Sequence, residues 1–242
     1  MGLFRLQYWE PYFKAFVALS EGDIVGVGNV VMNGQTGWLG NIIVLEKYRG
    51  QGIGQALVLA LCDCCRANGC TSIQLIATEM GLPLYVKLGF QMAENYLFMK
   101  GDSLPKPSGA SMLKPLEPDN FEDLLALDRE ATGEDRTLLL QKFATDGWGW
   151  MEQGRLGGFW LPQLGDGLIV ARWERAGIGL LQLKHSRQAG LPANLPEANR
   201  LAVAYLESEG FAIARTAPRL YLGSDTLRRP TMIYSRISGY LG

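Results

Sequence analysis

The feature that most constrains this chain is a glycine-rich turn between an alternating apolar segment and a long apolar run. The turn, Arg49-Gly-Gln-Gly-Ile-Gly54, leads directly into Gln-Ala-Leu-Val-Leu-Ala-Leu, residues 55–61. Glycine weakens a helix, so three glycines at the start of one need a reason. The first amides of a helix have no internal partner and, with the helix dipole, they bind anions. We therefore expect a phosphate or diphosphate at this helix N-terminus, with Arg49 adding a charged contact.

Two other phosphate-binding loops do not fit this sequence. A P-loop has a lysine directly after its last glycine, and Gln55 follows Gly54 here. A dinucleotide-binding turn reads Gly-x-Gly-x-x-Gly at the end of an opening strand, whereas Gly26-Val-Gly28 continues into a strand. A tight turn that holds no ligand remains the alternative.

The first half of the chain predicts the order strand, strand, loop, helix, strand, helix, strand. Two alternating segments, Ile24–Met32 and Thr36–Val44, flank Asn33-Gly34, which is a strong hairpin signal. Apolar residues then keep helical spacing from Ile53 until Asn68-Gly69 ends the helix. We expect the remaining elements at Ser72–Ala77 (strand), Leu82–Leu88 (helix) and Tyr96–Lys100 (strand). This order is typical of an α/β or α+β layer.

The second half follows a linker, Gly101–Gly109, that holds two prolines. We expect helices at Asp119–Glu130, at Asp135–Thr145 and from about Pro196 to Gly210. We expect strands near Trp150 and at Leu156–Leu161, Leu168–Ala171, Phe211–Thr216 and Arg219–Leu222. The halves resemble each other, because Tyr85–Phe90 and Tyr205–Phe211 both place a tyrosine helix before Gly-Phe and a strand. Gly52-Ile-Gly54 also has a counterpart in Gly177-Ile-Gly179. We infer an ancient duplication, with chance as the alternative.

Charge and hydropathy exclude several classes of partner. The net charge is −1, so no nucleic-acid footprint is expected. No apolar run approaches the roughly 18 residues that span a bilayer, and the N-terminus lacks the order of a signal peptide. We therefore expect a cytoplasmic protein without a membrane partner. The four cysteines, Cys62, Cys64, Cys65 and Cys70, match no common zinc spacing, and we expect small buried or half-buried thiols and no metal site.

With these elements in place, the chain resembles the GNAT superfamily of acetyl-CoA-dependent N-acetyltransferases. The family signature, Gln/Arg-x-x-Gly-x-Gly/Ala, is met by Arg49, Gly52 and Gly54. The lead-in Ile42-Ile-Val-Leu-Glu-Lys-Tyr-Arg49 is similar to the strand that precedes the family's loop. The segment Leu84-Tyr-Val-Lys-Leu-Gly-Phe90 is similar to the family's short tyrosine-containing helix.

A wider resemblance, to the tandem YitH-like branch of the superfamily, covers most of the chain. Its segments here are Ile73–Phe90, Leu127–Leu140, Leu195–Phe211 and Arg219–Gly223. The resemblance implies an α/β (α+β) fold of two tandem GNAT-like domains, each a mixed, mostly antiparallel sheet flanked by helices. We expect an acetyl-CoA-binding domain over 1–102, a linker over 103–111 and a degenerate GNAT-like domain over 112–242.

One departure from the family lies at the start of the chain. The family's first unit begins with a strand and two helices before the hairpin, but about twenty residues precede Ile24 here. Only Tyr8–Phe13 fits a remnant of those helices. The first domain is therefore expected to be shortened, to borrow a segment from a partner chain, or to come from a truncated reading frame. The missing helices usually help to wall the acceptor site.

The resemblance implies roles for individual residues. The strand Ile42–Val44 separates from the strand Ser72–Ala77, and the pantetheine arm of acetyl-CoA lies in the gap. A backbone N–H near Val44 holds the thioester carbonyl, and Tyr85 donates a proton to the departing thiolate. For Tyr85 the alternative is a packed aromatic ring with a bonded hydroxyl. The expected cofactor-binding residues are Ile42, Ile43, Val44, Arg49, Gly50, Gln51, Gly52, Ile53, Gly54 and Gln55.

The general base is less well defined by the sequence. Glu79, just after the predicted strand, is our candidate, and Glu46 at the loop entrance is a second one. Either carboxylate is more often a solvated surface acid. His185 is the single histidine of the chain, and we expect it at a surface or interface rather than in catalysis.

The second half is not expected to bind acyl-CoA. Glu174-Arg-Ala-Gly-Ile-Gly179 aligns with Arg49–Gly54, so that Glu174 replaces the arginine and Arg175 fills a glycine position. We expect this half to cover the first domain and to help form an acceptor cleft. Trp148, Trp150, Trp160 and Trp173 are expected to line that cleft or, as tryptophans more often do, to lie in the core.

These inferences give one main hypothesis and two rivals. The main hypothesis is an N-acetyltransferase that transfers an acyl group from acetyl-CoA to the amine of a small molecule or peptide in a ternary complex. The first rival is an acyl-CoA-binding sensor that has lost turnover. The second is a structural pseudo-dimer that binds no nucleotide. A homodimer is compatible with each of them.

Overall fold

The computed structural model describes residues 2–6 and 10–239 of the 242-residue chain. Its contacts divide the chain into two compact units. Unit 1 comprises Met1–Ala93, Arg219–Thr226 and Gly239–Gly242, and unit 2 comprises Glu94–Pro218 and Leu227–Ser238. This division differs from the expected ranges 1–102 and 112–242 at residues 94–102 and 219–226. The expected ranges stay a prediction of the bounds of the two domains.

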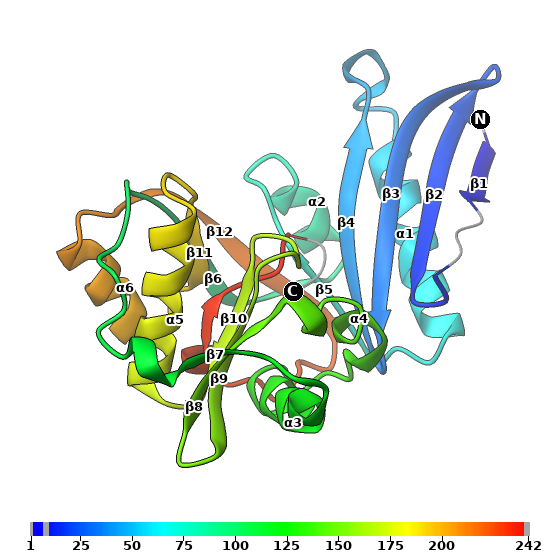
Figure 1. Cartoon of the computed structure of the whole chain (residues 1–242). Coiled ribbons are helices and arrows are strands. Elements are labelled where there is room, and N and C mark those ends of the chain that lie inside the picture. Colours follow the sequence, from blue (N-terminus) through cyan, green and yellow to red (C-terminus); the bar gives the residue numbers. More distant parts are fainter. Residues whose placement is uncertain (1, 7–9, 240–242) are drawn as a thin grey trace. The chain divides into compact units, whose positions relative to one another are not determined.

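Unit 1 is built on strands that follow one another in space as they do in the chain. They are β1 (Gly2–Leu6), β2 (Phe13–Ser20), β3 (Asp23–Asn33), β4 (Thr36–Val44) and β5 (Ser72–Ile76). The predicted hairpin is confirmed, because Asn33 pairs with Thr36 and Gly34 takes a positive φ of 59°. Figure 1 shows β1, β2, β3 and β4 side by side in blue and light blue.

The expected helical remnant at Tyr8–Phe13 is wrong where the structure describes it. Residues 11 and 12 form a turn and Phe13 begins β2, while residues 7–9 lie outside the described residues. Two antiparallel strands, β1 and β2, therefore precede β3 in place of helices. The apolar run Phe16-Val-Ala-Leu19 favours a strand, and its alternate residues Phe16 and Ala18 pack in the cluster that includes Ile53 of α1.

Helix α1 (Ile53–Ala67) packs on one face of β2, β3 and β4. It ends at Asn68 and Gly69 as predicted, with Gly69 at a φ of 81°. Its buried side includes Leu57 and Leu61, and a Cβ on Gly28 of β3 would lie 3.0 Å from Leu61 Cδ1. The glycine thus allows close packing of the helix on the sheet.

A strand from the far end of the chain completes unit 1. Residues 219–223 of β12 (Ala212–Gly223) pair antiparallel with β5, in register from Arg219 opposite Ile76 to Gly223 opposite Ser72. Arg219 Nη1 donates to Gln74 Oε1 at 2.9 Å and to Asp225 Oδ1 at 2.9 Å. The sequence predicts two strands here, but they form one continuous strand, because Ala217 and Pro218 keep the extended backbone.

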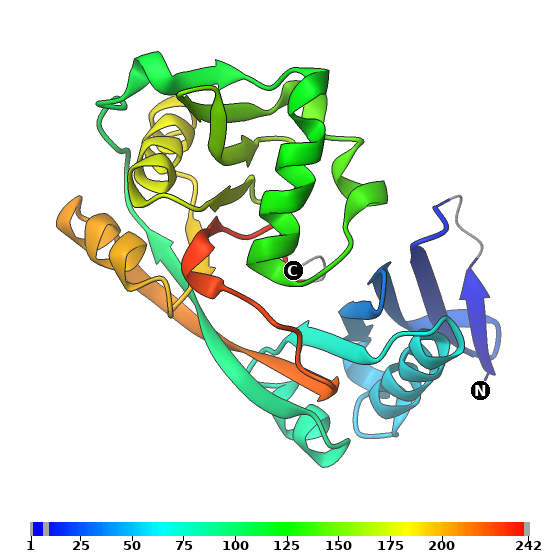
Figure 2. The same cartoon turned by 90° about the horizontal axis from the view of Figure 1, so that it is seen from below.

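Unit 2 contains a second sheet with helices on both of its faces. Its strand order is β13-β10-β9-β8-β7, formed by Ile233–Ser235, Leu168–Ala171, Arg155–Leu161, Trp148–Glu152 and Leu113–Pro115. Helices α3 (Phe121–Thr132) and α5 (Glu174–Arg187) pack on opposite faces of this sheet, as Figures 1 and 2 show. The predicted strands near Trp150, at Leu156–Leu161 and at Leu168–Ala171 are confirmed.

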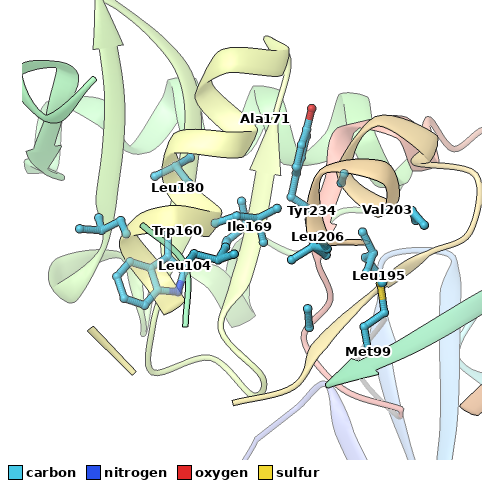
Figure 3. Packing of buried hydrophobic residues seen from close by; sticks show 14 of the residues in the cluster. Met99, Leu104, Trp160, Ile169, Ala171, Leu180, Leu195, Val203, Leu206 and Tyr234 are labelled. Atoms are coloured by element: carbon cyan, nitrogen blue, oxygen red, sulfur yellow. The ribbon is translucent and has the colours of Figure 1, made fainter. Parts of the chain in front are cut away.

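The core of unit 2 lies between α5, α6 (Arg200–Ser208) and the sheet. Figure 3 shows Trp160, Ile169 and Leu180 packed together in this core, with Tyr234 and Leu206 beside them. Two of the tryptophans that the sequence assigns to a cleft or to the core, Trp150 and Trp160, are buried here. The other two, Trp148 and Trp173, are half-buried and pack against the same cluster.

Two helix predictions in unit 2 need correction. The segment 135–145 holds only one turn of α-helix, α4 (Thr137–Leu140), and a separate 3-10 turn begins at Ala144. A buried ion pair between Arg136 and Asp128 holds the start of α4 against α3. The last helix begins at Arg200 rather than near Pro196, which ends strand β11 (Ala193–Pro196) opposite β6 (Gln91–Lys100). Asn199 caps this helix by accepting a hydrogen bond from the Ala202 amide at 3.2 Å.

The cysteines are buried or half-buried thiols, as predicted. Cys62, Cys65 and Cys70 are buried, Cys64 is half-buried, and all four are free of disulfides. Burial raises the pKa of the Cys62 thiol to about 11, which makes it a packing residue at neutral pH. Among the described residues, no helix is long and apolar enough to cross a bilayer.

Candidate functional site

A cavity of about 480 Å³ opens in unit 1 between the end of β4, the glycine-rich turn and helix α2 (Leu82–Lys87). It brings together every predicted cofactor-binding residue except Gln51, and it includes Tyr85. Gln51 instead donates from its side chain to the carbonyl of Lys47 at 3.4 Å. The lining residues are Ile42, Ile43, Val44, Tyr48, Arg49, Gly50, Gly52, Ile53, Gly54, Gln55, Thr78, Met80, Gly81, Leu84 and Tyr85.

Strand β4 has one unpaired edge beside this cavity. Its parallel pairing with β5 covers only Thr36–Trp38 against Ser72–Gln74, although β4 continues to Val44. The Leu45 amide donates to the carbonyl of Val25 in β3. Backbone groups alternate between the two edges of a strand, so the N–H and C=O of Val44 point to the opposite edge. Arg49 Nε donates to the Val44 carbonyl at 3.1 Å, which confirms that direction. The Val44 N–H therefore also faces the edge that β5 leaves open.

The glycine-rich turn exposes the first amides of α1. Gly50 and Gly52 have φ values of 74° and 81°, in the left-handed region that favours glycine. Gly52 is the N-cap residue of α1 and supplies no capping side chain. Among the described residues, no side chain caps α1, and its first residues line the cavity, so its first amides are available to an anion there.

Gly54 and its counterparts in the second half are glycines for different reasons. A Cβ on Gly54 would meet Leu84 at 3.6 Å and Val44 at 3.8 Å, which are ordinary contacts. A Cβ on Gly177 or Gly179 would lie only 2.1 Å from the Tyr234 ring or 2.2 Å from the Trp150 ring. Internal packing thus explains the glycines of α5. Internal packing does not explain Gly54, which lines the cavity.

Tyr85 lies on α2 with its ring against Phe90. The two ring centroids are 5.7 Å apart at an angle of 67°. Burial raises the pKa of the Tyr85 phenol, so the group stays protonated at neutral pH. Its hydroxyl has no hydrogen-bond partner among the residues that the structure describes. A Cβ on Gly81 would lie 2.9 Å from the Tyr85 ring, so this glycine makes room for the tyrosine.

The candidate bases are less well placed. Glu79 follows β5 and Glu46 begins a 3-10 turn, and both are exposed and outside the cavity lining. The expectation of a surface or interface His185 is wrong. This histidine is fully buried in unit 2, with its ring edge-on to Phe211 at 5.2 Å. Burial, with a smaller effect of Lys184, lowers the pKa of His185 to about 3.

Several residues that line the cavity are not among the predicted site residues. Thr78, Met80, Gly81 and Leu84 come from the turn and helix after β5, and Tyr48 comes from the turn before the glycines. They are neighbours in sequence of residues that were predicted. Their side chains carry no charge. Tyr48 and Leu84 lie in segments that resemble the family, and their position next to Arg49 and Tyr85 was the signal that could have indicated them.

Comparison with known proteins places this site in a family. Residues 2–90 match the model of the Acetyltransferase (GNAT) family. This matching part of the chain contains every residue that lines the cavity, and it is similar to the GNAT family. A glucosamine 6-phosphate N-acetyltransferase from Trypanosoma brucei brucei is 33% identical over 91 residues, which cover 35% of this chain and 62% of that protein. The N-acetyltransferase YitH of Bacillus subtilis, described as uncharacterized, is 36% identical over 125 residues, half of this chain and 43% of that protein.

Solved structures extend the GNAT fold to both halves. The crystal structure of a proposed acetyltransferase from Pyrococcus horikoshii superposes with a TM-score of 0.80 at 21% identity, over 94% of this chain and 80% of that one. A tandem GNAT protein from the clavulanic acid biosynthesis pathway superposes with a TM-score of 0.59 at 16% identity, over 88% and 84%. These likenesses confirm the predicted fold class, two tandem GNAT-like halves with sheets flanked by helices.

Proposed function

We propose that unit 1 binds acetyl-CoA and transfers its acetyl group to an amine. The observation that carries the proposal is Gly54, a helix glycine at the cavity that neither backbone conformation nor packing requires. A ligand that approaches the backbone at the start of α1 accounts for it. The free amides of this turn, with the nearby guanidinium of Arg49, suit the diphosphate of coenzyme A.

The open edge of β4 suits the pantetheine arm and the thioester of coenzyme A. The open edge of β4 at Val44 can bond to the amides of a pantetheine arm as an added strand would. The Val44 N–H faces this edge and can stabilise negative charge that develops on a thioester oxygen. Coenzyme A supplies the activated acyl group and a thiolate as leaving group.

Tyr85 is proposed as the acid that protonates the leaving thiolate. Its phenol is protonated, lines the cavity and has no partner among the described residues. Thiol and phenol pKa values are close enough for this proton transfer. Glu79 remains the proposed base and would act through water, since it lies outside the cavity lining.

The acceptor is proposed to be a small-molecule or peptide amine. The trypanosome relative is named for an amino sugar phosphate, so amino sugars belong first in a screen. The aligned residues span less than two thirds of either relative, and the acceptor of the whole protein is therefore open to test. A homodimer also stays a prediction.

Two measurements test the proposal in sequence. Acetyl-CoA should raise the melting temperature of the full chain by mass action, and Gly52→Glu should abolish the rise. Acetyl transfer to an added amine should then release free CoA. Tyr85→Phe should lower the rate of this release and leave the affinity for acetyl-CoA unchanged. An unchanged melting curve would refute nucleotide binding altogether. Binding without CoA release across amino sugars, amino acids, polyamines and peptides would favour the sensor.

A further inference from the structure

Exposed apolar side chains gather on the face of the unit 1 sheet that points away from α1. Ile43 and Leu45 at the end of β4 are 56% and 48% exposed, and Ile24 at the start of β3 is 55% exposed. Single exposed apolar residues are common on proteins, but a contiguous group of them indicates a binding surface. Ile24, Ile43 and Leu45 are called the apolar patch below.

The directions of the side chains follow from their neighbours. Val44 faces α1, because its Cγ2 lies 3.8 Å from the Cβ position of Gly54. Ile43 and Leu45 flank Val44 in an extended backbone, so both point away from α1.

Ile24 lies on the same face as the other two patch residues. It pairs with Leu19 of β2, and the preceding residue of β2, Ala18, packs against α1. Leu19 and Ile24 therefore point away from the helix. The Leu45 amide donates to the carbonyl of Val25 at 3.0 Å, which brings the start of β3 next to the end of β4. The three side chains thus form one surface.

A β-bulge decides that the end of β4 presents these residues outward. β4 has one residue more between Gly40 and Ile43 than β3 has between Asn29 and Val27. Asn41 lies in this bulge with a φ of 51°. Because side chains alternate, one extra residue exchanges the two faces of the strand beyond it. Without the bulge, Ile43 would face α1.

The apolar patch is continuous with the cavity of the candidate site. Ile43 lines the cavity, and so does Met80, which is 74% exposed in the turn after β5. Ile43 and Leu45 lie on either side of Val44, whose N–H faces the open edge of β4. A molecule that approaches Val44 from this face meets apolar side chains first.

We propose that the apolar patch binds the carbon skeleton of the acceptor, and that the acceptor is an amine on an alkyl or arylalkyl group. This inference rests on the proposed function. Acetyl-CoA on the α1 side of the open β4 edge leaves the other face of the sheet for the attacking amine. Contact with the patch removes apolar surface of the acceptor from water, and this favours binding in proportion to the area removed.

The charges beside the patch suit an amine without an anionic group. Asp23 and Glu46 are neighbours of patch residues in the chain, and both carboxylates are exposed. They attract the ammonium form of an alkylamine and repel a phosphate or carboxylate on the acceptor. Lys47, the next residue, places its Nζ 4.9 Å from the ring centroid of Tyr48, a lining residue of the cavity.

The experiment compares amines of nearly equal basicity and increasing chain length. The probes are ethylamine, butylamine and hexylamine, with D-glucosamine and 6-aminohexanoate as polar comparisons, and free CoA release is the readout. For the wild type, kcat/KM should rise about twofold to fourfold with each methylene added between ethylamine and hexylamine. The acceptor 6-aminohexanoate, which ends in a carboxylate, should be poorer than hexylamine by about tenfold or more.

Two matched substitutions of exposed leucines in unit 1 locate the effect. Leu45→Gln should lower the ratio of kcat/KM for hexylamine to that for ethylamine by about threefold or more, through KM, while the Tm rise with acetyl-CoA persists. Leu59 is 42% exposed on α1 and lies outside the cavity lining, so Leu59→Gln should keep the wild-type ratio. Ile24→Thr retains a β-branched side chain and should lower the ratio as Leu45→Gln does.

The possible outcomes separate the inference from the proposed function. CoA release without dependence on chain length, or a dependence that survives both Leu45→Gln and Ile24→Thr, would overturn the inference and leave acetyl transfer intact. A dimer in sedimentation velocity that Leu45→Gln dissociates, with no dependence on chain length, would assign the patch to a second copy of the chain and also overturn it. No CoA release from any of the probes, or from amino acids and polyamines, would count against acetyl transfer itself.

Discussion

The Gly54→Ala variant should be at least as stable as the wild type when no ligand is present. The added Cβ would lie 3.6 Å from Leu84 Cδ2 and 3.8 Å from Val44 Cγ2, and neither contact strains the fold. Alanine is favoured over glycine inside a helix by up to about 1 kcal/mol. For a chain of this size, 1 kcal/mol corresponds to roughly 2–4 °C in melting temperature. We therefore expect an unchanged or slightly raised Tm.

The same methyl group should weaken the binding of acetyl-CoA. Gly54 lines the cavity at the first turn of α1, where the proposed diphosphate approaches the backbone. An extra methyl group in a well-packed contact typically costs about 1–3 kcal/mol, and about 1.4 kcal/mol is tenfold in affinity. We expect the Kd measured by titration calorimetry to rise at least about tenfold. The Tm rise at 1 mM acetyl-CoA should shrink accordingly.

Gly179→Ala is the matched comparison in the second half. Its Cβ would lie 2.2 Å from the Trp150 ring, so the core of unit 2 must shift. We expect Tm to fall by several degrees, since overpacking costs about 1–3 kcal/mol, with the acetyl-CoA affinity of the folded protein unchanged. Wild-type affinity in Gly54→Ala would refute the argument that Gly54 serves the ligand. A large loss of stability in Gly54→Ala would refute the claim that the fold has room for a Cβ at this position.

Three further predictions concern single side chains. Arg49→Ala should weaken acetyl-CoA binding about tenfold in calorimetry, through loss of its charge and its 3.1 Å bond to Val44, and it should leave the ligand-free Tm within about 2 °C. Asp128→Ala removes the carboxylate that pairs with the buried Arg136 and leaves Glu134 as the nearby negative charge, so urea unfolding should show a loss of up to about 3–5 kcal/mol, and a loss below 1 kcal/mol would contradict this. Below pH 6.5 the unfolded chain protonates His185 while the folded chain, with a pKa of about 3, does not. Stability should therefore fall by up to about 1.4 kcal/mol per pH unit from pH 6.5 toward pH 3, and His185→Leu should flatten this slope in urea titrations at pH 7, 6 and 5.

The sequence predicts those parts of the fold whose signals are local. The hairpin at Asn33-Gly34 and the helix from Ile53 depend on turn chemistry and periodicity within one segment, and the structure has both. The pairing of Arg219 with Ile76 joins residues more than a hundred positions apart, and no local signal specifies it. The burial of His185 likewise depends on Phe211 and on the elements that surround α5.

The candidate site divides in the same way. The glycine-rich turn is predictable because Gly50 and Gly52 need a backbone conformation that other residues avoid. The β-bulge at Asn41 is not predictable, because its register is set across two strands. A β-bulge leaves no composition signal in the alternation of Thr36–Val44, so it becomes visible only in three dimensions.

The repeated Gly-Ile-Gly motif shows why a repeated sequence does not imply a repeated site. In the first half, an added Cβ at Gly54 meets ordinary contacts beside a cavity. In the second half, the space beside Gly177 and Gly179 is already filled by aromatic rings from the same unit. Selection for packing can keep glycine at such positions after a ligand is lost, because a larger residue would clash. The same three letters are therefore evidence of a ligand only where the protein itself leaves the space beside them open.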